Sequence, residues 1–303
     1  MSPAPTTSVP SSSPVRQVAL ITVGAVALFF VVRMLPTGTS LSHMDFRVSG
    51  GNSIEFCDPA NPQFLPVVNV RSPVTMALQT GAAPVAGATV RLTVTLKTGS
   101  GKPIEPVDLV LSHTRLLHLL IIDPTLGDYQ HVHPEPTATP GEWTVEFKPR
   151  HAGNYRVFAD FTPSATGRGL YASADLDVTG GAPVTAEAPA DDKRWDFSLV
   201  PAAPIRAGVP ADLKLSLGNA SGGNVPLQPV MGAFAHLVAF DATRSGFAHL
   251  HPMEVDLLAP PDAVHPQLNF KVTIPEPGRY VIWAQVNVGG TEIFRPFAFE
   301  VGR

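Results

Sequence analysis

Cysteine is nearly absent from this chain of 303 residues, which contains only Cys57. A single cysteine excludes an intrachain disulfide framework and any cysteine-rich zinc site. It also argues against a blue-copper centre, which needs a cysteine ligand close to its histidine and methionine ligands. Cys57 itself is either a metal ligand or a packed side chain. Because no partner residue lies near it in the sequence, packing is favoured.

Charged residues are also scarce, at 15% of the chain, against a usual value of about 25%. The formal net charge of −4 and the absence of a basic patch give no electrostatic reason to expect nucleic acid as a partner. Catalytic motifs are missing as well, because the chain has no Gly-x-Ser-x-Gly, no His-Glu-x-x-His and no phosphate-binding glycine loop. We therefore expect a protein that is not an enzyme.

Proline and glycine, by contrast, are abundant, with 32 and 25 residues. They separate short runs rich in Val, Leu and Phe, and helical periodicity is absent beyond the first segment, which predicts a mainly β chain. The predicted architecture is one N-terminal transmembrane helix followed by two tandem Greek-key β-sandwich domains. The predicted divisions are a tail 1–14, a transmembrane helix 15–36, a connector 37–70, a first sandwich 71–179, a linker 180–191 and a second sandwich 192–303.

The N-terminal apolar run is long enough to cross a bilayer. A helix over Val15–Leu35 would measure roughly 31 Å, close to the hydrocarbon thickness of a membrane. A cleaved signal peptide is the alternative, but Arg33 closes the run and no small-x-small cleavage site follows it directly. These features favour an uncleaved anchor. We expect a bacterial inner membrane protein that contacts the lipid bilayer through this helix and carries its main domains in the periplasm.

The strongest feature of the sequence is a motif that occurs twice. A histidine is followed 13 and 15 residues later by the histidines of a His-x-His-Pro, and the two copies are 118 residues apart. Together they use six of the ten histidines, which are His118, His131, His133, His236, His249 and His251. A Gly-x-Tyr also repeats, at Tyr155 and Tyr280, and predicts two phenols that tie back loops as in a tyrosine corner.

Each copy of the motif predicts a β-hairpin, because an apolar run is followed by a connector containing Asp and Gly and then by a second short run. Histidines two apart in a strand share one face. The first histidine joins that face whether it pairs with the last histidine or with the one two residues earlier, at roughly 4.5–5.5 Å between Cβ atoms. The same face carries apolar side chains, which are Leu120, Ile122, Tyr129, Val238, Phe240 and Phe247.

Three imidazoles on one rigid hairpin suit copper or zinc and leave room for a further ligand. Three neighbouring side chains are weaker candidates for that place, namely His113, Met231 and Met253. The histidines can equally be structural, with one imidazole hydrogen-bonded to a loop carbonyl and another packed on an aromatic ring. The duplicated spacing is expected under either interpretation, because a duplication copies structure as well as sites.

The pattern of a histidine, a His-x-His-Pro and a strand entered through Gly-x-Tyr resembles exported bacterial β-sandwich domains of immunoglobulin-like or cupredoxin-like shape. These domains are often associated with copper. The resemblance covers about residues 71–179 and 192–303, and the metal ligands that it implies are the six histidines of the two motifs. This chain differs in lacking methionine-rich flanks.

Two functions are therefore predicted. The first is an accessory subunit that contacts other subunits of a larger inner-membrane complex, respiratory or photosynthetic, through its helix and its sandwiches. Low charge and apolar strands leave surface that suits such contacts. The alternative is a periplasmic copper- or zinc-binding protein that uses the histidine hairpins.

Overall fold

The computed structural model describes residues 13–34, 63–180 and 194–303. The expected tail 1–14, the connector 37–70 with Cys57, and the linker 180–191 lie largely or wholly outside these residues. One compact unit contains the N-terminal helix, and a second unit, Ser42–Arg303, contains all the described strands.

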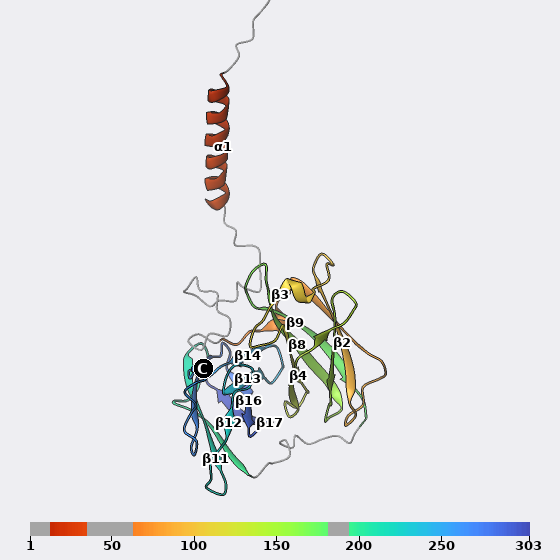
Figure 1. Ribbon diagram of the computed structural model, residues 1–303, viewed down its shortest axis with the longest axis vertical. Helices are drawn as coiled ribbons and strands as arrows, with labels where there is room; N and C mark the ends of the chain where they lie inside the picture. Colours follow the sequence, from red (N-terminus) through yellow and green to blue (C-terminus); the bar gives the residue numbers. More distant parts are fainter. Residues whose placement is uncertain (1–12, 35–62, 181–193) are drawn as a thin grey trace, which may run out of the picture. The chain divides into compact units, whose positions relative to one another are not determined.

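Helix α1 spans Pro14–Met34 and is long and apolar enough to cross a membrane by length and composition (Figure 1). Its apolar side chains, such as Leu20 and Phe29, are exposed around the helix. A helix that is apolar on all sides has no amphipathic face for packing against a soluble domain, as expected for a membrane segment or a signal sequence.

The first sandwich consists of two antiparallel sheets. One sheet contains β1 (Val74–Thr80), β2 (Val90–Thr98), β7 (Glu142–Phe147) and β6 (Glu135–Pro136). The other contains β3 (Leu109–Val110), β4 (Leu117–Ile122), β5 (Tyr129–Val132), β8 (Gly153–Pro163) and β9 (Leu170–Val178). Short 3-10 turns, Val67–Asn69 and Pro106–Asp108, precede β1 and β3.

The second sandwich repeats this plan. Its smaller sheet contains β10 (Trp195–Pro201), β11 (Pro210–Asn219) and β15 (Gln267–Thr273). Its larger sheet contains β12 (Leu227–Gln228), β13 (Ala235–Asp241), β14 (Phe247–Leu250), β16 (Gly278–Val288) and β17 (Thr291–Val301) (Figure 1). The mainly β fold with two tandem domains is therefore as predicted.

Each sandwich closes over its own apolar core because the outer strands alternate in polarity. In β2 the side chains of Val90, Leu92, Val94 and Leu96 are buried between exposed or half-buried neighbours. Full burial of one such side chain stabilises the fold by about 1.5–3 kcal/mol.

Strands β4 and β13 differ, because each is buried on both faces. Every residue of β4 is buried, and in β13 only the last residue is half-buried. In β4, Leu117, Leu119 and Ile121 belong to the core of the first sandwich. The opposite face of β4 carries Leu120 and Ile122, which belong to a third core shared by the two sandwiches.

This shared core, which we call the interface core, joins the two hairpin faces predicted from the sequence. It contains all six apolar side chains expected on those faces, together with Phe158 of β8 and Trp283 of β16. The Trp283 indole N–H donates to the backbone oxygen of Leu126 in the first hairpin loop, at 3.2 Å. Arg244, at the equivalent place in the second loop, donates to the backbone oxygen of Asn154. The sandwiches thus contact each other through equivalent elements.

The segment before the first sandwich also packs onto the second one. Leu65 pairs with Phe247, and Val67 joins the interface core. This approach requires a glycine at position 246, because a Cβ there would lie only 1.7 Å from the backbone oxygen of Leu65.

Candidate metal centre

The strand register places the histidines as the hairpin geometry predicts. In the first hairpin Leu119 pairs with Val132 and Leu120 pairs with His131, so the next step of the same register sets His118 opposite His133. In the second hairpin Leu237 pairs with Leu250, which sets His236 opposite His251 in the same way. The Asp residue that opens each loop accepts backbone N–H bonds, as expected from its turn preference.

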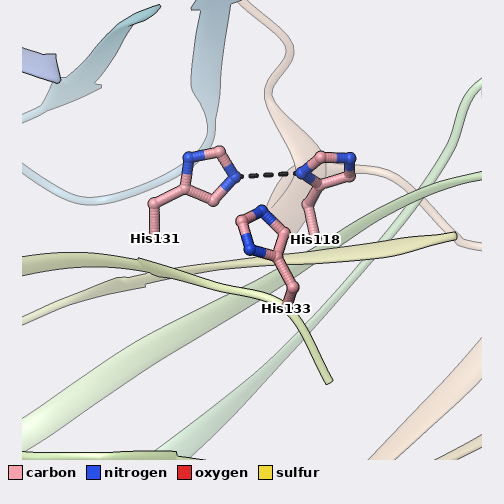
Figure 2. Close-up of side chains that lie close together, drawn as sticks. All are labelled: His118, His131 and His133. Atoms are coloured by element: carbon pink, nitrogen blue, oxygen red, sulfur yellow. Dashed lines mark hydrogen bonds between the residues drawn. The ribbon is translucent and has the colours of Figure 1, made fainter. Parts of the chain in front are cut away.

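The first triad consists of His118, His131 and His133. Each side chain offers one nitrogen, and the three nitrogens lie within 4.8 Å of one another. His118 Nδ1 and His131 Nε2 are 3.0 Å apart, and the rings converge on one point (Figure 2). The His133 ring centroid is 4.9 Å from that of His118 and 4.8 Å from that of His131.

The second triad consists of His236, His249 and His251 and has the same geometry. Its nitrogens also lie within 4.8 Å of one another, with His236 Nδ1 and His249 Nε2 3.1 Å apart. Two ligands at 2.0–2.1 Å from a tetrahedral ion are separated by about 3.4 Å. Both triads therefore come close to the arrangement that an ion needs, and small adjustments complete it.

A hydrogen bond to a backbone carbonyl orients the first histidine of each triad. His118 Nε2 lies 2.9 Å from the backbone oxygen of Ser112, and His236 Nε2 lies 2.9 Å from that of Val230. A carbonyl oxygen only accepts, so both Nε2 atoms carry a proton, and in a neutral imidazole Nδ1 then presents a lone pair. Metal-binding histidines are oriented by outer partners of this kind.

The second histidine of each triad is oriented by the opposite sandwich. His131 Nδ1 lies 2.9 Å from Gln285 Oε1, and His249 Nδ1 lies 3.4 Å from Asp160 Oδ2. The Gln285 amide nitrogen donates to Glu292, which directs the amide oxygen toward His131. Asp160 and Gln285 occupy equivalent places, since each follows the repeated tyrosine by five residues.

These partners leave the first triad one proton short. The series Ser112 oxygen, His118, His131 and Gln285 oxygen contains three close contacts, and each contact needs one proton. Two neutral imidazoles supply only two protons. With both outer contacts made, His118 Nδ1 and His131 Nε2 face each other as two lone pairs, and a cation between them removes the conflict. An ionised Asp160 creates the same deficit in the second triad, whereas a protonated one supplies the missing proton.

Burial keeps most of these imidazoles neutral. It lowers the pKa of His131, His236 and His249 far below the usual value, and repulsion by neighbouring histidines adds to the effect. Burial lowers the pKa of His133 to about 3, and the neighbouring His118 and Arg115 side chains add to the effect. Neutral imidazole is the form that binds metal ions. Burial also raises the pKa of the Asp160 carboxyl, against the opposing effect of the histidines.

The two triads form one cluster at the interface between the sandwiches. The ring centroids of His131 and His249 are only 5.4 Å apart, and those of His118 and His249 are 6.2 Å apart. The two sequence motifs predict a ligand set on each hairpin and do not show that the two sets meet. The orienting pair Asp160 and Gln285 was not predicted either, and its signal in the sequence is the equivalent place of both residues after the repeated tyrosines.

The weaker candidates have different positions. His113 lies against the second triad, with its ring centroid 3.9 Å from that of His251. Met231 occupies the turn equivalent to that of His113, and both residues have positive φ, 50° and 48°. Met253 is 46% exposed, unlike the buried histidines of its triad.

A separate polar network has a structural role. The Tyr155 hydroxyl donates to Asp128 Oδ2 at 2.7 Å and accepts the N–H of His151 at 3.0 Å. His151 Nδ1 lies 2.8 Å from Asp123 Oδ2. Tyr280 donates to the backbone oxygen of Glu276, four residues earlier. Both phenols tie back the loop before their strand, as predicted.

Comparison with known proteins identifies the class of domain but names no activity. Residues 69–180 and 189–303 each match the family described as "Domain of unknown function (DUF8832)", so the chain belongs to this family and carries two tandem copies of its domain. No curated protein sequence matches the chain.

Among solved structures, the chain is similar to native alpha-2-macroglobulin of Escherichia coli, at 13% identity and a TM-score of 0.25, over 75% of this chain and 17% of that one. It is also similar to red sea bream transglutaminase, at 10% identity and a TM-score of 0.25, over 77% of this chain and 32% of that one. The chain thus spans less than a third of the length of these proteins, and the likeness is too low to support any functional argument.

Proposed function

We propose that this protein is a non-catalytic, membrane-anchored metal-binding protein that holds one copper or zinc ion in each histidine triad. The observation that carries the proposal is the first triad, where His118 Nδ1 and His131 Nε2 lie 3.0 Å apart with both outer nitrogens directed at carbonyl oxygens. A bound cation satisfies both lone pairs at once, whereas a purely structural role leaves a buried acceptor pair or a buried charge, each of which is costly.

The donors favour copper and zinc. Imidazole nitrogen is a ligand for both ions, whereas magnesium and calcium prefer oxygen ligands. The resemblance to copper-associated exported sandwich domains supports the same choice. A competition experiment distinguishes the two ions. Copper should displace zinc from the triads, because copper binds such sites more tightly in the general affinity order.

Burial supports binding rather than catalysis. His118 is 1% exposed and His236 is fully buried, and of the six triad histidines only His133 is half-buried, so the ligands offer substrate little open approach. Catalytic zinc sites keep one position accessible to water or substrate. Helix α1 supports a membrane anchor, and the proposed location is the periplasmic face of a bacterial inner membrane.

The test is metal analysis of the full chain purified in detergent. After loading with Zn²⁺ or Cu²⁺ and removal of excess, we expect two ions per chain in the wild type. His131→Ala/His133→Ala and His249→Ala/His251→Ala should each retain one ion. His265→Ala, which changes an exposed histidine outside the triads, should retain two. A folded wild-type protein that binds neither metal overturns the proposal.

We also propose, as a second function compatible with the first, that the protein is an accessory subunit of an inner-membrane complex. Exposed apolar side chains support it, such as Val107 and Leu111 before β4 and Leu258, which is 94% exposed, after β14. Purification from native membranes in mild detergent tests it. A defined set of stoichiometric partners is expected, and recovery of the chain alone contradicts it.

A further inference from the structure

His113 belongs to the first sandwich but lies against the histidines of the second. It stands in the turn between β3 and β4, where Ser112 and Arg115 form a tight bridge. Its ring centroid is 3.9 Å from that of His251 and about equally far, 6.0 and 5.9 Å, from those of His236 and His249. In the triad of its own sandwich, the ring centroid of His118 is 6.2 Å from that of His113.

The His113 ring has an unused nitrogen and lies beside this cluster. Nε2 is buried and has no hydrogen-bond partner among the described residues. Leaving such a polar atom unbonded costs stability. A metal ion bound to Nε2 removes this cost. The positive φ of His113, 48°, is a property of the turn itself, because Met231 adopts 50° at the equivalent place.

We infer that His113 is a fourth ligand to the metal ion of the second triad, which makes that site a four-imidazole centre shared between the two sandwiches. The inference rests on the proposed metal-binding function. Four nitrogen donors complete the tetrahedral shell that zinc adopts in closed, structural sites. The ion would then link the sandwiches directly, in addition to the interface core.

The duplication makes the two sites unequal. The position equivalent to His113 is Met231, which has the same turn and nearly the same φ of 50°. The first sandwich therefore places an imidazole beside the second triad, whereas the second sandwich has only the Met231 thioether at the equivalent place. Zinc sites in proteins are built from Cys, His, Asp and Glu ligands, and a thioether is not among them. The second site is accordingly the tighter zinc site of the two.

The test isolates the second site. In the His131→Ala/His133→Ala background, Zn²⁺ affinity is measured by competition with a chelator for His113→Ala, His113→Phe and, as the matched control, Met231→Ala. Phenylalanine keeps a ring against His251 but removes the nitrogen. We expect both His113 variants to weaken Zn²⁺ binding at least ten-fold and the control to bind as its parent does. Substituted Co²⁺ should change its d–d absorption only in the His113 variants.

The outcomes separate the two proposals. Unchanged affinity in both His113 variants overturns the fourth-ligand role. Loss in His113→Ala with full retention in His113→Phe also overturns it, because stacking alone would then explain the contact. A folded parent that binds no metal overturns the proposed function itself. Thermal unfolding of each metal-free variant establishes that the comparison is made between folded proteins.

Discussion

His131 of the first sandwich and Gln285 of the second are joined by a hydrogen bond of 2.9 Å between Nδ1 and Oε1. The bond crosses the interface, and it determines which nitrogen of His131 is free to face His118. The equivalent pair, His249 and Asp160, crosses in the opposite sense at 3.4 Å. Each triad is thus built by one sandwich and oriented by the other, so metal binding and sandwich packing depend on each other.

The first prediction concerns Gln285. Gln285→Met keeps a similar volume but removes the oxygen that accepts from His131. We expect metal affinity at the first triad to fall about 10–100-fold, as for the loss of other orienting partners. Asp160→Leu should act in the same way on the second triad. Chelator competition in the two single-triad backgrounds measures both effects, and an equal loss at both sites from either variant would contradict the assignment.

The second prediction concerns the interface core. Trp283 is fully buried there and donates to Leu126 across the interface. Trp283→Ala should lower the free energy of unfolding by about 3–5 kcal/mol, because it leaves a large cavity. Trp283→Phe removes the hydrogen bond and less volume, and should cost less. Val255→Ala, at an exposed site, serves as the control and should change stability by less than about 0.5 kcal/mol. Urea unfolding decides, and equal stability of Trp283→Ala and wild type would show that the sandwiches do not stabilise each other.

The two hairpins show which features of the site could be predicted from the sequence. Spacing and turn chemistry predicted the strands, the shared face of His118 and His133 and the apolar residues beside them, because these follow from the period of a strand. The packing of the two hairpin faces against each other was not predictable. The sequence of each repeat shows an apolar face that must be buried, but it does not show which part of the protein buries it. His113 lies far from the second triad in sequence, and only the packing of the sandwiches brings it to His251.

The third prediction compares the two loop-tying tyrosines. Tyr155 donates to the buried carboxylate of Asp128 and accepts a backbone N–H, whereas Tyr280 makes one bond to a half-buried carbonyl. Tyr155→Phe leaves Asp128 and the His151 N–H each without one bond and should cost about 1.5–3 kcal/mol. Tyr280→Phe should cost about 0.5–1.5 kcal/mol. Unfolding curves measure both changes. Metal stoichiometry should stay the same in both variants, and a loss of metal in Tyr155→Phe would contradict the purely structural role.

The fourth prediction is a dependence of stability on pH in the metal-free protein. Burial lowers the pKa of His113 and His133 to about 3 and those of His131, His236 and His249 well below normal. In the unfolded chain these histidines titrate near 6.5. Below that pH the unfolded state binds more protons than the folded state, so stability is fully present above about pH 6.5 and falls as the pH decreases. The raised pKa of Asp160 acts in the opposite direction, but it is one group against five.

Bound metal should shift this loss to lower pH, because protons must displace the ion before the imidazoles can titrate. Thermal unfolding between pH 8 and 4, with a chelator or with Zn²⁺, separates the two curves. At a free ion concentration 100 times the dissociation constant, one site adds about 2.7 kcal/mol at neutral pH. The variant His113→Ala/His133→Ala removes two of the titrating groups and should flatten the chelated curve. A chelated wild-type curve that is already flat between pH 7 and 5 would mean that the histidine cluster is not held neutral by burial, and the proton count that leads to a metal ion would then lose its basis.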